Sequence, residues 1–414
     1  MAVVRPFQGI RPNKDLVKKV ASLPYDVMNR EEAQEMAKGN EYSFLHVVRS
    51  EIDIDSEVSQ YDQIVYKTAR ENMDKMIKQD ILKQDEKPNF YIYRQIMFGR
   101  VQTGLVACTA IDDYINGNIK KHEYTRPSKE VDRINNFDYC DANTAPIFLT
   151  YRKNEEINKI INEHIKFNKP IYNFTSEDNI IHIVWAVDED NVIEKINKIF
   201  ANIDYLYIAD GHHRSASAVK VGLKRREDNK NYTGEEEFNY FLSVIFPNED
   251  LFIMDYNRIV QDLNGNSTEE FLDKVKMNFI IEEYKDGCYK PTSKHTFGMY
   301  LDKKWYKLKA KNTITEKDNI VDRLDVAILQ ENLLKPILGI EDPRTDKRID
   351  FIGGIRGLKE LEKRVNNDMK VAFSMYPTTI DDLMEVADSG QVMPPKSTWF
   401  EPKLRSGLFI HKLS

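Results

Sequence analysis

Cysteine is scarce in this chain, and long apolar runs are missing. Three cysteines occur among 414 residues, at Cys108, Cys140 and Cys288, and their spacing matches neither a disulfide framework nor a metal site. This low, odd count predicts reduced thiols in a cytosol. No apolar run approaches the roughly 20 residues that span a bilayer, and the first residues lack the apolar segment of a signal peptide. We therefore expect a cytoplasmic protein with no membrane partner.

An excess of positive charge is missing as well. Lys and Arg number 60 against 67 Asp and Glu, which gives a formal net charge of −7. Proteins that bind nucleic acid usually carry a basic excess, so we expect no nucleic-acid partner. A hydrophobic content of 41% with 31% charged residues is ordinary for a chain that buries a core. The length allows two or three domains, and no internal repeat or low-complexity linker divides them.

The apolar pattern alternates between helix-like and strand-like segments and predicts a mixed α/β (α+β) fold. The longest amphipathic helix is expected over residues 59–84. Two strands, 89–97 and 103–114, flank a turn at 98–102 and predict a hairpin. Residues 44–49 also predict a strand.

Two regions are expected along the chain. Residues 1–245 form an N-terminal α/β region, and residues 246–414 form a C-terminal α/β region that includes a strong helix over 321–334. The last residues are rich in aromatic and aliphatic side chains, so we expect this tail to pack back on the core and the two regions to work as one functional unit.

The stretch from Leu206 to Val219 combines a strand, a turn and a helix start. Residues 206–209 are apolar, and the charged motif Asp210-Gly-His-His-Arg214 follows directly. A strand that ends in a turn and opens a helix presents free backbone N–H groups and the positive end of the helix dipole. Such a point is a natural site for phosphate or carboxylate. Four ionisable side chains in five residues are costly at a strand end unless a ligand uses them.

A second polar stretch runs from residue 119 to residue 133. His122 and Glu123 are candidates for a base or a metal ligand. The side chains suited to phosphate in this stretch are Thr125, Arg126, Lys129 and Arg133. The alternative is a solvated loop and helix start with local ion pairs.

The third candidate segment lies near the C-terminus. Its phosphate-compatible side chains are Lys396, Ser397, Thr398, Lys403, Arg405 and Ser406. Residues 396–398 are similar to the end of a phosphate-binding loop, but the glycine-rich part of that motif is missing, so no P-loop is predicted. An exposed edge strand is the alternative interpretation.

The Asp210-Gly-His-His-Arg214 motif resembles the signature of domain of unknown function family 1015, a group of bacterial and archaeal cytosolic proteins. Further blocks resemble that family in the same order along nearly the whole chain. They are Arg5-Pro-Phe7, Pro24-Tyr-Asp-Val27, Ser43–Arg49, His122-Glu-Tyr-Thr125 with Asp132-Arg133, Asn143 with Pro146, Pro394–Thr398 and Ser406-Gly407. One departure is visible, because Ser215 and Ala216 stand where the family commonly has an aromatic and an acidic residue.

The same motif is similar to the nucleotide-phosphate turn of a wider superfamily, which includes sulfiredoxins, ParB-type partition proteins and free serine kinases. This resemblance implies a ParB/sulfiredoxin-like nucleotide-binding core with additional mixed strands and helices. It also implies ATP or ADP as a cofactor and phosphoryl transfer that involves serine or phosphoserine. Fold alone does not determine function.

Phosphoryl transfer requires charge neutralisation at the phosphate and a well-placed nucleophile. We expect the Gly211 N–H and Arg214 to hold a phosphate. Asp210 and Glu123 are the candidate ligands for Mg²⁺, and either could instead act as a base toward a hydroxyl.

The histidines are the remaining catalytic candidates. His212 or His213 could contact the transferring group or accept a phosphoryl group, with His122 nearby as a base. Successive side chains diverge along a chain, so one of the adjacent pair is expected to face the core, and we favour His213 for the site. Zinc is disfavoured because no cysteine or third histidine lies close in sequence.

We therefore expect phosphotransfer or phosphate-ester hydrolysis on a small metabolite, with serine or phosphoserine preferred, as a serine kinase or a phosphoserine phosphatase-like enzyme. A non-catalytic, nucleotide-binding regulatory switch is the alternative, and a scaffold with a degenerate pocket is a third. The expected partners are a small-molecule substrate and a nucleotide, and an oligomer remains open. We also expect segments 122–133, 206–219 and 396–406 to converge on one pocket.

Overall fold

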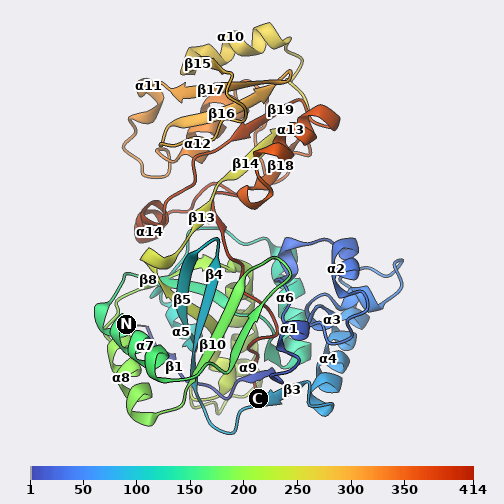
Figure 1. Ribbon diagram of the computed structural model, residues 1–414, viewed down its shortest axis with the longest axis vertical. Coiled ribbons are helices and arrows are strands. Elements are labelled where there is room, and N and C mark those ends of the chain that lie inside the picture. The colour runs from blue at the N-terminus through green and yellow to red at the C-terminus, as the bar shows by residue number, and fades with distance from the viewer. Residues whose placement is uncertain (1) are drawn as a thin grey trace. The chain divides into compact units, whose positions relative to one another are not determined.

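The computed structural model describes residues 2–414, and its contacts divide the chain into two compact units (Figure 1). Unit 1 contains the residues up to Leu251 together with Pro402–Ser414, and unit 2 contains Phe252–Glu401. The boundary expected near residue 245 falls inside strand β12 (Tyr240–Pro247). Each unit has its own sheet and its own hydrophobic core.

A mixed sheet forms the centre of unit 1, with the strand order β6-β11-β8-β12-β5-β4-β10-β9 and β1 paired to β5. Besides β12, its strands are β1 (Val4–Arg5), β4 (Phe90–Met97), β5 (Arg100–Ala110), β6 (Ile119–Lys120), β8 (Ile147–Tyr151), β9 (Tyr172–Thr175), β10 (Ile181–Val187) and β11 (Leu206–Asp210). The pairs β8–β12 and β6–β11 are parallel, and the other pairs are antiparallel. Strand β12 is buried along its whole length, as expected for a central strand covered on both faces.

The predicted hairpin is confirmed as the β4–β5 pair, but its turn is tighter than expected. Met97 pairs with Arg100, so only Phe98 and Gly99 form the loop. Both have positive φ, 50° and 78°. A two-residue loop with φ above zero at both positions is a type I′ turn, which suits the twist of a hairpin.

Helices surround the sheet of unit 1. They are α1 (Val17–Val20), α2 (Arg30–Ala37), α3 (Leu45–Val48), α4 (Gln63–Lys78), α5 (Ile111–Ile115), α6 (Pro127–Cys140), α7 (Glu155–Phe167), α8 (Asp190–Phe200) and α9 (His212–Asp228). Helix α9 packs against α5 and α6, and α6 also packs against α4. In Figure 1, α2, α3 and α4 lie together beside α6. Two small strand pairs, β2 (Ile10–Pro12) with β3 (Leu82–Gln84) and β7 (Ala142–Asn143) with β21 (His411–Lys412), complete the unit.

Two sequence predictions in unit 1 are wrong. Residues 44–49, predicted as a strand, contain helix α3, because a short run that is buried at every position except His46 has no clear period that separates helix from strand. The helix predicted over residues 59–84 is shorter. Asp62 caps α4 by accepting a hydrogen bond from the Ile64 N–H, and the chain leaves the helix after Lys78 to enter β3.

Unit 2 has an antiparallel sheet with the order β15-β17-β16-β19-β14-β18. These strands are β14 (Tyr256–Val260), β15 (Phe279–Tyr284), β16 (Thr296–Leu301), β17 (Lys304–Ala310), β18 (Ile349–Gly353) and β19 (Val371–Ser374). Its helices are α10 (Thr268–Asn278), α11 (Asn312–Thr315), α12 (Asp325–Leu329), α13 (Leu358–Asn367) and α14 (Ile380–Asp388). The pair β13 (Ile253–Met254) and β20 (Trp399–Phe400) lies at the two ends of this segment.

The helix predicted over residues 321–334 is also shorter than expected. It begins at Asp325 as α12 and continues into a π-helical turn, Gln330–Leu334. The mixed α/β fold class is confirmed by both units. None of the helices described over residues 2–414 is long and apolar enough to cross a membrane.

Candidate phosphate site at the start of helix α9

The turn between β11 and α9 is built on a left-handed glycine. Strand β11 ends at Asp210, Gly211 has φ 94° and ψ 33°, and α9 begins at His212. A Cβ atom on Gly211 would lie only 3.0–3.1 Å from three guanidinium atoms of Arg214. Glycine is therefore required twice, for its backbone conformation and for the space that Arg214 occupies.

Arg214 lies beneath this turn. Its side chain is buried, with 3% exposed, and its Nη1 donates a hydrogen bond to the carbonyl of Pro146. Its Nε is buried without a hydrogen-bond partner among the described residues. A buried donor without a protein partner is unusual.

Asp210 is held by a lysine from the last residues of the chain. Lys403 Nζ lies 3.0 Å from Asp210 Oδ2, and the backbone carbonyl of Lys403 accepts a hydrogen bond from Gln95 at 3.0 Å. Burial alone would raise the pKa of Asp210, but the charges of Lys403 and Arg214 outweigh it and hold that pKa well below its usual range. Asp210 is therefore ionised, and its charge is balanced from within unit 1.

His212 and His122 form a buried ring pair beside the turn. Their ring centroids are 4.4 Å apart and nearly perpendicular, and the His122 backbone N–H points to His212 Nε2 at 3.5 Å. His212 Nδ1 lies 3.8 Å from the Glu123 carboxylate. Neither ring nitrogen of His122 has a hydrogen-bond partner of ordinary geometry among the described residues.

Both rings are neutral at neutral pH. Burial lowers the pKa of His122 to about 4, although the charge of Asp210 and the backbone of Ile208 raise it in part. Burial, and then the neighbouring His122, lowers the pKa of His212 well below its usual value. Neutral imidazoles next to an anion-binding turn can accept protons.

His213 faces a different group of side chains. Its Nε2 accepts a hydrogen bond of 2.9 Å from the Arg126 backbone N–H at the start of α6. Burial lowers its pKa, while the nearby carboxylates of Asp26 and Glu130 raise it and the charges of Arg126 and Lys129 lower it. Of its two ring nitrogens, only Nδ1 remains available for a ligand.

Thr125 and Glu130 belong to the same region. The Thr125 hydroxyl donates to the Glu130 carboxylate, which also pairs with Lys220 of α9. Glu130 and Lys220 thus tie the start of α6 to α9. The predicted residues His122, Glu123, Thr125, Asp210, Gly211, His212, His213 and Arg214 therefore gather around one helix start.

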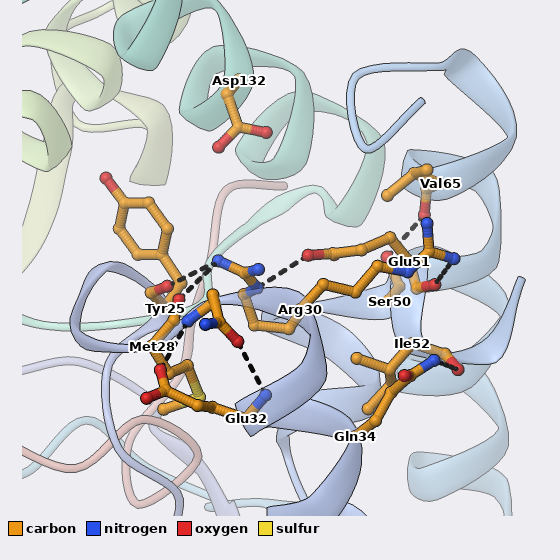
Figure 2. A network of polar contacts seen from close by, with 12 residues as sticks. Tyr25, Met28, Arg30, Glu32, Gln34, Ser50, Glu51, Ile52, Val65 and Asp132 are labelled. Carbon is orange, nitrogen blue, oxygen red and sulfur yellow. Dashed lines mark hydrogen bonds and ion pairs between the residues drawn. The ribbon is translucent and has the colours of Figure 1, made fainter. Parts of the chain in front are cut away.

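Arg133 belongs instead to a neighbouring buried network, of which Figure 2 shows Tyr25, Met28 and Asp132. Its guanidinium pairs with Asp132 at 2.9 Å and lies over the Tyr25 ring at 4.0 Å. Arg49 completes this network by donating to the backbone carbonyls of Tyr25 and Met28. The cavity that Tyr25, Asp132 and Arg133 line measures about 10 Å³, which is room for about one water molecule.

Arg405 takes part in a third network of unit 1. Its guanidinium pairs with Asp178, donates to Ser176 at 3.2 Å and approaches His182 at 3.4 Å. Burial, and then the charge of Arg405, lowers the pKa of His182 to about 3. Nδ1 of this neutral ring and the Tyr93 hydroxyl share a hydrogen bond of 2.7 Å.

The remaining predicted phosphate ligands, Lys396, Ser397 and Thr398, lie in unit 2. Lys396 has φ 61°, and its carbonyl accepts a hydrogen bond from Arg258. The Ser397 hydroxyl donates to the Pro394 carbonyl at 2.6 Å. The convergence of this segment with the β11–α9 turn stays a prediction.

Two residues of the site were not singled out from the sequence. Lys403 is one of the six phosphate-compatible side chains of the C-terminal segment, but nothing in its spacing connects it to Asp210. Asp26 belongs to the Pro24-Tyr-Asp-Val27 block, whose resemblance to a family motif was the available signal. In the structure this block forms the short helix η1 (Tyr25–Val27), close enough for Asp26 to act on the pKa of His213.

Comparison with protein families decides which family the chain represents. The model described as "Protein of unknown function (DUF1015)" matches residues 4–327. This chain belongs to the DUF1015 family. The DUF1015 match includes the β11–α9 turn and ends before the segment that supplies Lys403. No curated protein matches the sequence of this DUF1015 member.

Among solved structures, the likenesses are distant. "Free serine kinase in complex with AMP" is 15% identical, covers 72% of this chain and 86% of its own, and has a TM-score of 0.36. "Conserved hypothetical protein from Pyrococcus furiosus" is 15% identical, and the match covers 73% of this chain and 93% of that protein, with a TM-score of 0.35. "SbnI with C-terminal truncation from Staphylococcus aureus" is 11% identical, and the match covers 72% of this chain and 82% of that protein, with a TM-score of 0.36.

Proposed function

We propose that the β11–α9 turn binds the phosphate groups of a nucleotide, and that this DUF1015 member catalyses phosphoryl transfer or phosphate-ester hydrolysis on a small metabolite. The observation that carries the proposal is the left-handed Gly211 packed on the buried Arg214 at the first turn of α9. The first N–H groups of a helix have no partner within it and attract anions.

Two further observations support a ligand at this point. The Nε of Arg214 and both ring nitrogens of His122 are buried without partners among the described residues. In addition, Lys403 balances the charge of Asp210, so an incoming phosphate meets a backbone donor array and a guanidinium rather than an uncompensated carboxylate.

The side chains around the turn supply the other needs of phosphoryl transfer. Burial keeps His122 and His212 neutral and disfavours their protonated forms. Glu123, 3.8 Å from His212 Nδ1, would counter this by stabilising the positive charge that forms when His212 accepts a proton from an attacking hydroxyl. His213 Nδ1 remains for contact with the substrate, since its Nε2 is already engaged by Arg126.

Magnesium would be held here largely by the phosphate oxygens, because Mg²⁺ commonly takes only one or two protein carboxylates in such sites. Glu123 and Asp210 are the candidate ligands, and the ion would supply neutralisation of the phosphate charge. Over residues 2–414, no three His, Cys, Asp or Glu side chains gather as ligands of one metal ion. Serine and phosphoserine are the substrates to test first, because the Asp210-Gly-His-His-Arg214 motif resembles the turn of free serine kinases.

The test uses the purified full chain with phosphoserine and Mg²⁺, with and without AMP or ADP, and in the reverse direction with serine and ATP. Serine, inorganic phosphate and nucleotides are quantified. We expect product in at least one direction. Nucleotide binding with no product in any combination would refute the enzyme and favour a regulatory switch.

A variant pair tests the location. Arg214→Lys keeps the charge but removes Nε, so it should weaken nucleotide binding measured by calorimetry. Arg225→Lys is the matched control, because Arg225 lies on the same helix and pairs with Asp141 instead. Equal binding by both variants, with circular dichroism unchanged, would show that the turn is not the phosphate site.

A further inference from the structure

A second cavity lies wholly within unit 2. It measures about 420 Å³, within the range of about 300–1,000 Å³ that is usual for small-ligand pockets. Residues 294–295, the segment 320–325 and the segment 376–385 at the start of α14 line it. None of these residues belongs to the β11–α9 turn, and the inference drawn from them does not depend on the function proposed above.

One wall of the cavity holds an oriented histidine. The Asp325 carboxylate accepts hydrogen bonds from the His295 backbone N–H at 2.9 and 3.1 Å and contacts His295 Nδ1 at 3.1 Å. Burial raises the pKa of Asp325, and the bonds from His295 counter that rise. Since Asp325 occupies Nδ1, the ring nitrogen that remains for a ligand is Nε2.

The backbone of this histidine is strained. His295 has φ 66°, a left-handed conformation that is uncommon for residues other than glycine, although histidine, asparagine and aspartate adopt it more often than the others. Strain of this kind persists where the surrounding contacts hold it and is enriched at ligand sites. The two bonds from Asp325 to the backbone and ring of His295 are the contacts that hold it here.

Part of the cavity's charge is already paired. Lys294 Nζ lies 2.7 Å from Asp382, and the same carboxylate caps α14 through Thr379. These groups are satisfied within unit 2. Lys294, Thr379 and Asp382 therefore support the wall of the cavity, and a ligand would contact the other charged groups of the lining.

Three charged side chains of the lining have no such partner. Arg323, Asp381 and Glu385 are exposed at the mouth of the cavity's lining, and within residues 2–414 their side chains make no ion pair or hydrogen bond. Asp381 and Glu385 are four residues apart on α14 and so lie on one face of that helix. The cavity therefore offers one cation and a pair of carboxylates, together with the Nε2 of His295.

We propose that this cavity binds a free α-amino acid. The carboxylate of the ligand pairs with Arg323, and its ammonium group lies between Asp381 and Glu385. A purely anionic ligand would meet the two carboxylates, and a simple amine would leave Arg323 without a partner. The His295 Nε2 faces the ligand side chain, which favours amino acids that carry a hydrogen-bond donor there.

The experiment screens the standard L-amino acids against the full chain by calorimetry. At least one should bind with one-to-one stoichiometry, while its N-acetyl derivative and its amide, which each lack one of the two charges, should bind at least about tenfold more weakly. Arg323→Ala and Glu385→Gln should each weaken binding by a similar factor. Arg344→Ala and Glu269→Gln are matched exposed controls in unit 2 and should leave it unchanged.

Three outcomes would overturn the proposal. The first is that no amino acid binds. The second is that the N-acetyl derivative or the amide binds as well as the free amino acid. The third is that Arg323→Ala and Glu385→Gln bind normally; if Arg214→Lys removes binding in that case, the amino acid occupies the β11–α9 turn instead. Failure of this screen leaves the phosphoryl-transfer assay unaffected, since that assay follows product rather than binding.

Discussion

Substitution of Gly211 by alanine tests whether Arg214 is locked beneath the turn. The new Cβ would lie 3.0 Å from Arg214 Nε and 3.1 Å from Cζ and Nη2. The alanine would also adopt φ 94°, which L-residues avoid. The substitution therefore combines a backbone strain with a collision against one buried side chain.

The two effects have separate magnitudes. The left-handed backbone costs about 1–2 kcal/mol for a residue with a Cβ. If Arg214 must move, it loses its hydrogen bond to the Pro146 carbonyl, and a bond from a charged donor is worth about 1.5–3 kcal/mol. Gly211→Ala should thus lower the free energy of unfolding of unit 1 by about 2.5–5 kcal/mol.

Gly117→Ala is the matched control. Gly117 has φ 77°, and no atom lies within 4 Å of the position its Cβ would occupy. Gly117→Ala therefore introduces the backbone strain without the collision, and it should lower the free energy of unfolding by only about 1–2 kcal/mol. Both substitutions restrict the unfolded chain equally, so that contribution cancels in the difference.

Hydrogen exchange of the β12 amides measures the stability of unit 1 separately from unit 2. A double-mutant cycle with Arg214→Ala then isolates the contact, because the collision should disappear when the guanidinium is removed. Equal costs for Gly211→Ala and Gly117→Ala, or additivity in the cycle, would refute the packing of Arg214 against Gly211.

Three further substitutions have defined outcomes by urea unfolding. His122→Phe removes two unpartnered buried nitrogens and should stabilise unit 1 by about 1–3 kcal/mol at neutral pH. The gain in the free energy of unfolding should grow as the pH falls from about 6.5 towards the folded pKa of about 4, because the variant lacks the loss of stability that the depressed pKa of His122 causes in the wild type. Lys403→Met should lower the free energy of unfolding by about 2 kcal/mol, because the ion pair between Lys403 and Asp210 is only partly buried. That cost should fade below about pH 4, where the unfolded chain protonates Asp210. Phe98→Asn should raise the free energy of unfolding by about 1 kcal/mol, because asparagine suits the type I′ turn. The phenyl ring it replaces is 82% exposed and has little packing to lose.

The strand, turn and helix at the site could be predicted because their signals are local. Residues 206–209 are apolar, a glycine follows the charged strand end, and the next residues favour a helix. The structure has β11, a left-handed Gly211 and α9 at these positions. Local signals were insufficient for residues 44–49, where burial of every residue except His46 hides the helical period.

The partners of the charged side chains could not be predicted, because they come from distant segments. Lys403 is 193 residues from Asp210, with the whole of unit 2 between them. Arg214 was expected to point at a ligand, yet it donates to Pro146, 68 residues away. Sequence spacing carries no information on such contacts, which depend on how the sheet of unit 1 is assembled.

The return of the last residues to unit 1 explains how an ionised aspartate can lie at the proposed anion site. Ser406 pairs with Ser22 and Ile410 with Ile10, and the Leu413 N–H donates to Asp141. These backbone contacts place Lys403 beside Asp210, where its charge offsets a carboxylate that would otherwise repel phosphate. The charge of Asp210 at the proposed anion site is therefore offset only when this segment is docked, which makes a residue beyond the DUF1015 match part of that proposed site.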